Sequence, residues 1–367
     1  MPDRNIGILA LNAGSSSLKF GLYTVDGTEP VERVSGSMTS DGDQRVFLLD
    51  SPRGRLQRRA VRADSALQAI FLLGEMRELP PPSVIGHRIV HGGISLHQHA
   101  RVDDSVLRQL DAASVFAPLH VPPALRLLVD AMATFPDATQ IACLDTVFHN
   151  GMPDVSRVLP LPAALRNGGV ERVGFHGLSC ESVVRQLGRD CPSRIVIAHL
   201  GSGCSVTAVR DGCSVDTSMG LTPAGGVMMA TRPGDIDPGI LLYLLREGRY
   251  SIAALEDMFE RQSGLSGVSG TSADARELLA QSATQPMAAL ALAQFTRSVA
   301  RHIAGMIVAL GGIDLLVFTG GIGEHALTLR ADILNQLAPL VCDLAVRVVP
   351  ARENDCIAQH AWKLARH

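Results

Sequence analysis

Short apolar segments alternate along the chain with longer segments of helical periodicity. Apolar or alternating runs predict strands at 8–11, 18–25, 140–144, 195–200, 205–209, 213–216 and 315–318, and a further strand pair between Val31 and Val61. Periodic segments predict helices at Ser65–Glu78, Val106–Phe116, Pro122–Phe135 and Pro286–Leu310. Strands that alternate with helices predict an α/β fold.

Three of the predicted strands lead into turns that are rich in glycine and small hydroxyl residues. These turns are Asn12–Ser17, His199–Gly203 and Thr319–Gly323. Each turn alone is typical of a tight hairpin, but such turns also present backbone N–H groups and hydroxyls to an anion such as phosphate. The first two turns each join a pair of strands, and this repeat indicates a duplication. Together, the three turns predict a nucleotide held between two similar halves.

Size and composition restrict the class of protein. A chain of 367 residues predicts about two or three domains, and 46% apolar with 19% charged residues is typical of a globular protein. A formal net charge of −3 argues against a nucleic-acid or membrane-surface partner. No apolar run approaches the ~20 residues that span a bilayer, and the polar start predicts no signal peptide. Seven cysteines without a C-x-x-C pair predict reduced thiols in a cytoplasmic protein.

Histidine, arginine and aspartate residues recur in apolar surroundings between the glycine turns. The residues concerned are Arg88, His120, Asp145, His176 and Arg232. A desolvated guanidinium is costly unless an anion matches its charge. Two arginines and several histidines around one site therefore suit a reaction that concentrates negative charge. Phosphoryl transfer is such a reaction, because its catalysis is mostly positioning and charge neutralisation.

Two other kinds of protein remain as alternatives at this point. One is a nucleotide-switched ATPase of the actin or chaperone type, because the Walker pattern of P-loop proteins is absent. The other is a metal hydrolase, since His87 and His91, and likewise Asp145 and His149, are four residues apart. Ligands at that spacing need a helix to face one zinc ion, whereas the segment around Arg88 reads as a strand, which disfavours the hydrolase.

With these residues in view, the chain resembles the acetate kinase family, which includes propionate and butyrate kinases. The resemblance lies in LNAGSSSLKFGLY, GHRIVHGG, APLHVPPAL, CLDTVFHNGMP, RVGFHGLS, HLGSGCSV, VDTSMGLTPAGGVMMATRPGDIDPG, SGLSGVSG, LLVFTGGIGEH and PARENDCIAQHA. These stretches occur in order over nearly the whole chain, and the VDTSMG…DIDPG block is highly specific.

The resemblance implies two duplicated actin-like (ribonuclease H-like) α/β domains around a central cleft, as in the superfamily of acetate and sugar kinases, heat-shock chaperones and actin. It implies an N-terminal domain of 1–147 plus 355–367, a C-terminal domain of 148–354, and a homodimer formed through the second domain. It also implies reversible, in-line transfer of the ATP γ-phosphate to a short-chain carboxylate with Mg²⁺ or Mn²⁺, giving an acyl phosphate and ADP.

The resemblance also assigns roles to individual residues. Catalytic groups are implied at Arg88, Asp145, His176, Arg232 and His120. Nucleotide contacts are implied at Asn12, Ser15, Ser17, Lys19, His199, Gly201, Ser202, Gly203, Gly320, Gly321, Ile322, Gly323 and Glu324. An apolar pocket for the acyl group is implied at Val90, Leu119, Phe175 and Pro223, and metal contacts at Asn12 and Glu353.

Five positions depart from the pattern of the family. Ser202 and His325 replace asparagines of the second phosphate loop and the adenosine loop, Val121 replaces asparagine, Cys180 replaces histidine, and Val173 replaces tyrosine. All the charged catalytic positions are retained. The departures leave open a divergent paralogue with an altered phosphoryl donor or with a preference for propionate or butyrate.

Overall fold

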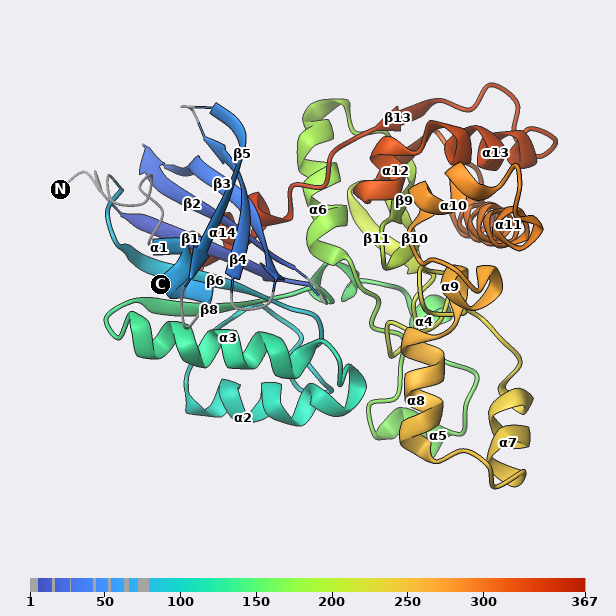
Figure 1. The fold of residues 1–367 in the computed structure, drawn as a ribbon, viewed down its shortest axis with the longest axis horizontal. Helices are drawn as coiled ribbons and strands as arrows, with labels where there is room; N and C mark the ends of the chain where they lie inside the picture. The colour runs from blue at the N-terminus through green and yellow to red at the C-terminus, as the bar shows by residue number, and fades with distance from the viewer. Residues whose placement is uncertain are drawn as a thin grey trace. The chain divides into compact units, whose positions relative to one another are not determined.

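The computed structural model describes residues 6–14, 17–26, 28–41, 44–51, 54–62, 66–71 and 79–366. The chain divides into two compact units (Figure 1): unit 1 is Met1–Val147 with Arg352–His367, and unit 2 is Phe148–Ala351. The short segment Arg352–Asn354, which the sequence prediction assigned to the second domain, belongs to unit 1. Each unit is built around its own sheet.

Unit 1 contains an eight-stranded sheet in the order β5-β4-β3-β2-β1-β6-β8-β7. Its strands are β1 (Gly7–Ala13), β2 (Leu18–Asp26), β3 (Glu29–Asp41), β4 (Gln44–Ser51), β5 (Gly54–Arg62), β6 (Pro82–Ile89), β7 (Ala100–Arg101) and β8 (Thr139–Leu144). Strands β1 to β5 form an antiparallel meander, while β1, β6 and β8 are parallel to one another.

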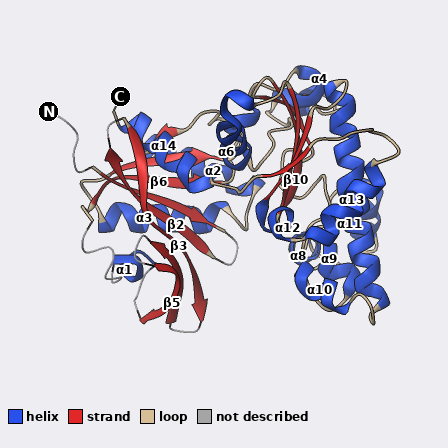
Figure 2. Cartoon of the chain, turned by 90° about the horizontal axis from the view of Figure 1, so that it is seen from above, coloured by secondary structure: helices blue, strands red, loops and turns tan. Residues whose placement is uncertain are grey.

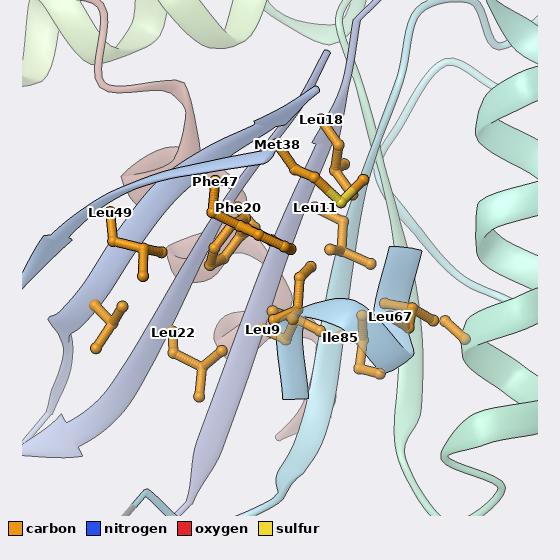
Figure 3. Packing of buried hydrophobic residues seen from close by; sticks show 13 residues of the cluster. Leu9, Leu11, Leu18, Phe20, Leu22, Met38, Phe47, Leu49, Leu67 and Ile85 are labelled. Atoms are coloured by element: carbon orange, nitrogen blue, oxygen red, sulfur yellow. The ribbon is translucent and has the colours of Figure 1, made fainter. Parts of the chain in front are cut away.

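Helices cover both faces of this sheet. They are α1 (Ala66–Phe71), α2 (Asp104–Ala112), α3 (Val121–Thr134) and α14 (Glu353–Ala365). Side chains alternate between the faces of a strand. A Cβ on Gly86 would lie 2.6 Å from Ile357 of α14, whereas Ile85 packs in a cluster with Ala131 of α3. The two helices therefore lie on opposite faces, and Figure 3 shows the apolar cluster between β1–β4, β6 and α1.

Unit 2 repeats the arrangement of unit 1. Its five-stranded sheet has the order β11-β10-β9-β12-β13. The strands are β9 (Arg194–Leu200), β10 (Cys204–Arg210), β11 (Cys213–Thr217), β12 (Leu315–Thr319) and β13 (Val346–Val348). The first three are antiparallel and the last two run parallel to β9, which matches β3-β2-β1-β6-β8 in order and direction. The predicted α/β fold with a duplicated domain is confirmed.

The helices of unit 2 lie on both sides of its sheet. They are α4 (Asp154–Arg157), α5 (Ala163–Asn167), α6 (Gly177–Leu187), α7 (Pro238–Arg246), α8 (Ile252–Arg261), α9 (Gly264–Ser269), α10 (Ala275–Gln281), α11 (Pro286–Leu310), α12 (Gly320–His325) and α13 (Leu327–Leu337). Helix α6 packs through Val183 and Leu187 against Ile195 and Ile197 of β9. Figure 2 shows α11 and α13 on the side opposite to α6.

Most predicted elements are confirmed, with two corrections. The predicted strand pair between Val31 and Val61 is wrong, because three strands, β3 to β5, occupy this stretch. The prediction of a third glycine turn is wrong in part. Gly320 (φ 78°) makes a sharp bend, but the residues after it form α12. The predicted helix at Ser65–Glu78 is described only as far as Phe71, where α1 ends.

The seven cysteines are all free thiols, as the sequence predicted. Within the described parts of the chain, no helix combines the length and the apolar character needed to cross a bilayer. The location in the cytoplasm stays a prediction from the sequence.

Candidate active site

In unit 1, three parallel strands bring predicted site residues to one edge of the sheet. In the parallel register Leu11 pairs with His87 and Ile89 pairs with Leu144, so β1, β6 and β8 end side by side. Asn12, Arg88 and Asp145 stand at these ends. Alternation places all three on the face covered by α14, whose first residue is Glu353. The carboxyl ends of parallel strands are where open α/β sheets bind ligands.

These four side chains form one hydrogen-bonded network. The Nε of Arg88 donates to Oδ2 of Asp145 at 2.8 Å, and its Nη2 donates to the same oxygen. The Nη1 of Arg88 donates to Oδ1 of Asn12 at 3.1 Å. The Nδ2 of Asn12 in turn donates to Oε2 of Glu353 at 2.6 Å. Asn12, Asp145 and Glu353 are buried, so the network fixes the direction of the guanidinium.

The charges of this network are unequal. Two carboxylates and one guanidinium give a formal charge of −1 when all are ionised. Burial alone would lower the pKa of Arg88, but the charges of Asp145 and Glu353 raise it further than burial lowers it. Arg88 is therefore held as a cation. The remaining negative charge and the oxygen atoms of Asn12 and Glu353 suit a hard divalent cation, which prefers oxygen ligands.

The other predicted residues of unit 1 lie along the same elements. The backbone N–H of Gly14 donates to the carbonyl of Ser17 at 2.8 Å and closes the tip of the β1–β2 hairpin. Lys19 is exposed on β2, where it pairs with Asn12 in the antiparallel register. His120 directly precedes α3. Val90 is buried and Leu119 is half-buried, whereas Ser15 lies outside the described residues.

In unit 2, two glycine segments meet at the ends of β9 and β12. These strands are parallel, and Thr319 pairs with His199. A Cβ on Gly320 would lie 2.8 Å from the carbonyl oxygen of Leu200, and one on Gly323 would lie 3.7 Å from the Leu200 Cβ. Gly320 therefore allows a close approach that a side chain would block. The segment Gly201–Gly203 and helix α12 lie side by side as a result.

Two histidines and an arginine surround the segment Gly201–Gly203. The Nε2 of His176 is 3.2 Å from the position that a Cβ on Gly203 would take, and the Nη1 of Arg232 is 3.9 Å from it. The Nε2 of His199 is 3.8 Å from the corresponding position on Gly201. The rings of His176 and His199 stack with their centroids 4.1 Å apart. Donors from three separate segments therefore face one glycine loop.

Arg232 is held from two sides. Its Nη1 donates to the carbonyl of Pro223 at 2.9 Å, and its Nε forms an ion pair with Oε2 of Glu260 at 2.9 Å. Burial lowers the pKa of Arg232, although Glu260 acts in the opposite direction. The backbone N–H of Ala230 donates to the carbonyl of Ser202 at 3.2 Å, which ties this segment to the glycine loop.

The remaining predicted residues of unit 2 differ in their exposure. Phe175 and Pro223 are buried. Gly321 is exposed, and Ile322 is half-buried in the first turn of α12. One carboxylate oxygen of Glu324 accepts from the N–H of Gly320 at 3.1 Å and from the N–H of Ala351 at 3.0 Å. Glu324 thus braces the bend at Gly320.

The sequence reasoning missed three residues that hold the predicted ones. Glu260 pairs with Arg232, Ser205 contacts Nδ1 of His176 at 2.9 Å, and Ser179 contacts Nδ1 of His199 at 2.8 Å. Alternation along β10 gives a weak signal for Ser205, since it shares a face with Val209, which packs near α6. Ser179 and Glu260 could not be singled out from the sequence, because serine and glutamate are common residues.

The residue pairs considered for a metal hydrolase have other contacts. His87 Nε2 donates to Oε1 of Gln140 at 2.8 Å, and His91 Nδ1 accepts from the N–H of Gly93 at 2.8 Å. His149 lies between Ser214 and the carbonyl of Phe175. In the part of the chain that the structure describes, neither pair belongs to a group of side chains that could share a metal ion.

The buried histidines predict how stability depends on pH. Burial lowers the pKa of His87 and of His149 to about 4, more than their hydrogen bonds raise it. In the unfolded chain both would titrate near 6.5. The folded state therefore has its full stability above pH 6.5, and we expect each histidine to remove about 3 kcal/mol as the pH falls to about 4.

Urea unfolding of the wild type and of His149→Gln at pH 7, 5 and 4 would measure this loss. The variant is expected to be less stable at pH 7 but to lose less free energy of unfolding between pH 6.5 and 4. Equal losses in the two proteins would contradict the assignment.

Comparison with known proteins gives a consistent result. A model of the Acetokinase family matches residues 7–361. The chain is 38% identical to an acetate kinase of Rhodopseudomonas palustris (strain TIE-1), with 98% of each chain covered. A propionate kinase from Francisella tularensis subsp. tularensis SCHU S4 has a similar structure, with a TM-score of 0.87, 31% identity and coverage of 98% of this chain and 100% of that one. For an acetate kinase of Porphyromonas gingivalis the TM-score is 0.82 at 29% identity, with the same coverage.

Proposed function

The chain belongs to the acetokinase family, and on that premise we propose that it transfers the γ-phosphate of ATP reversibly to acetate, giving acetyl phosphate and ADP. The observation that carries the proposal is the group of His176, His199 and Arg232 around the glycine loop Gly201–Gly203. Such a set of donors at the ends of parallel strands suits a phosphate group. The family match does not favour the alternative of an actin- or chaperone-like ATPase.

The chemistry asks little of the protein beyond positioning and charge. Acetate is already ionised at neutral pH, so it can attack the phosphorus without a general base. Arg88 and Arg232 would hold the carboxylate and the moving phosphoryl group, and His176 with His120 would donate hydrogen bonds to the phosphoryl oxygens as charge builds up. Asp145, which holds Arg88 on two nitrogens, would keep that guanidinium in its productive direction.

Both units carry residues that the family resemblance assigns to the nucleotide. In unit 1, Asn12, Ser15, Ser17 and Lys19 would contact the phosphates, while Gly201–Gly203 and Gly320–Glu324 of unit 2 would contact the phosphates and the adenosine. Asn12 and Glu353 would hold Mg²⁺ or Mn²⁺, an assignment supported by the oxygen donors and the excess negative charge of their network. When bound, the ion neutralises charge on the phosphate oxygens.

The residues that the family resemblance assigns to the acyl group, Val90, Leu119, Phe175 and Pro223, are all apolar. One methylene in an apolar pocket changes binding by only ~1–3 kcal/mol, so propionate and butyrate are expected as substrates too.

A hydroxylamine trap tests the proposal directly. The purified protein is incubated with Mg²⁺, a phosphoryl donor (ATP or pyrophosphate) and acetate, propionate or butyrate, and the hydroxamate formed from any acyl phosphate is measured. We expect acetohydroxamate with ATP. ATP hydrolysis without hydroxamate for any of the three acids would contradict the proposal and favour the ATPase alternative. Activity with pyrophosphate alone would identify a divergent donor preference instead.

We further propose that unit 2 forms a homodimer through α7. This helix has no buried residue, although it is rich in apolar side chains. Its exposed apolar residues are Ile240, Leu242, Tyr243 and Leu245. Four exposed apolar side chains within six residues of one helix are typical of a protein–protein interface.

A charge on this face is expected to separate the subunits. Leu242→Asp should convert the dimer to a monomer, because a carboxylate would be desolvated in the interface. Light scattering after gel filtration measures the mass. Val308→Asp, at an exposed apolar residue on α11, is the matched control and should stay dimeric. A wild-type monomer, or a dimer that survives Leu242→Asp, would refute this interface.

A further inference from the structure

Both histidines beside the glycine loop are anchored in the same way. The Nδ1 of His176 lies 2.9 Å from the hydroxyl of Ser205, and the Nδ1 of His199 lies 2.8 Å from the hydroxyl of Ser179. Both serines are buried, one on β10 and one on α6. Each ring therefore uses Nδ1 for a serine and turns Nε2 toward Gly201–Gly203.

The direction of these hydrogen bonds decides what the rings can offer. A neutral imidazole has one N–H, so a proton on Nδ1 makes Nε2 an acceptor and a proton on Nε2 makes it a donor. Phosphate oxygens that carry no proton accept hydrogen bonds and do not donate them. Only the Nε2–H tautomer is therefore useful to a phosphoryl group at this loop. Two stacked imidazolium ions with centroids 4.1 Å apart would repel each other, so at least one ring is neutral.

The serines supply the donor that this tautomer needs. Among the described residues, the hydroxyl hydrogens of Ser205 and Ser179 have no other hydrogen-bond acceptor than the two Nδ1 atoms. Each hydroxyl can thus donate to Nδ1 and leave the ring proton on Nε2.

A third pair in unit 2 has the same geometry with an unambiguous direction. The Nδ1 of His149 lies 2.9 Å from the hydroxyl of Ser214, and its Nε2 lies 2.9 Å from the carbonyl oxygen of Phe175. A carbonyl only accepts, so Nε2 of His149 carries the proton and Ser214 donates to Nδ1. His149 is therefore an internal reference for the pairs beside the loop.

We propose that Ser205 and Ser179 are positioning residues that hold His176 and His199, when these rings are neutral, as Nε2–H tautomers, so that two N–H donors face the phosphoryl group at Gly201–Gly203. The catalytic part of this inference depends on the proposed kinase function, whereas the tautomers do not. Without its serine, a ring would populate both tautomers and would offer its donor only part of the time.

Nitrogen NMR of the full chain labelled with ¹⁵N-histidine tests the tautomers without substrate. His176→Gln, His199→Gln and His149→Gln assign the signals. In the wild type, Nε2 of His176 and His199 is expected to carry the proton, as for His149. Ser205→Ala should give His176 a mixture of tautomers, and Ser205→Thr, which keeps the hydroxyl, should restore the wild-type pattern. Ser182→Ala is the control, since that buried hydroxyl donates to a carbonyl, that of Ser179.

Steady-state kinetics of acetyl phosphate formation test the positioning role. Ser205→Ala should lower kcat about 10-fold with little change in KM, because ground-state contacts to the nucleotide remain. A wild-type spectrum with the proton on Nδ1 of His176 would overturn the inference, and so would an unchanged tautomer in Ser205→Ala. Both results can be obtained even if Ser205→Thr does not fold. An altered tautomer with unchanged kcat would refute the positioning role. An enzyme that forms no acetyl phosphate would refute the proposed function and leave the tautomers to be judged by NMR.

Discussion

Arg88→Ala is expected to lower kcat for acetyl phosphate formation by at least about 100-fold, the scale for losing one preorganised charge contact. The Arg88 side chain is only 14% exposed, and three hydrogen bonds of its guanidinium fix the direction of that group. Water cannot replace it with the same orientation. The coupled assay of ADP formation with saturating acetate and ATP measures the effect. Arg101→Ala, at an exposed arginine of the same unit, is the control and should keep the wild-type rate.

The same substitution should also lower stability, and this effect can be separated from catalysis. Asp145 is fully buried, and removal of Arg88 would leave its carboxylate without the guanidinium. Breaking a buried ion pair on one side costs about 3–5 kcal/mol. Arg88→Ala combined with Asp145→Asn should recover much of this loss but none of the activity. Near-normal turnover in Arg88→Ala would contradict the proposed mechanism.

The elements of the fold could be predicted well where local signals agree. Helix α11 spans Pro286–Leu310 as predicted, because proline suits the first turn and Gly311 adopts a left-handed conformation (φ 67°) at the end. The β1–β2 hairpin was also predicted, because two strand-like segments flank a turn rich in glycine and serine. Between Val31 and Val61 the presence of strands was predicted, but their number was not, because a strand in a meander gains its stability from neighbours that the local sequence does not identify.

The candidate site could be predicted in its charged residues and not in their partners. A buried arginine implies an anion, which singled out Arg88 and Arg232. Their partners depend on contacts far along the chain, since Arg88 meets Asp145 across 57 positions and Asn12 across 76. Only the register of three parallel strands brings these residues together. Ser205 and Glu260 could not be predicted, because hydroxyl and carboxylate groups are common and their contacts depend on their positions in the folded structure.

The duplication explains why both units place their polar residues alike. In each unit the ends of parallel strands face the beginning of a helix, α14 in unit 1 and α6 in unit 2, with Glu353 and His176 at those positions. The two sites nevertheless differ in charge. The network of Asn12, Arg88, Asp145 and Glu353 has an excess of negative charge, whereas the loop at Gly201–Gly203 is surrounded by donors. This difference is what the proposed function would require, in which the residues of unit 1 hold the metal ion and the loop of unit 2 binds phosphate.

Arg232→Ala is expected to lower kcat by at least about 100-fold and to cost less stability than Arg88→Ala. Burial outweighs the attraction of Glu260 and lowers the pKa of Arg232, so this cation is incompletely compensated until an anion binds. Its removal leaves Oε2 of Glu260 buried without the guanidinium, but the Glu260 side chain is 17% exposed whereas Asp145 is fully buried, so the loss should be smaller than in Arg88→Ala. Thermal unfolding and the coupled assay measure the two effects.

Two further variants make the test of Arg232 decisive. Arg232→Lys keeps the charge but loses the planar donor fork, and it should recover only part of kcat. Arg261→Ala, at an exposed arginine of α8, should leave both kcat and stability unchanged. If Arg232→Ala lost stability but kept full activity, Arg232 would stabilise the fold and have no part in catalysis. The phosphate side of the site would then have to be sought elsewhere in unit 2.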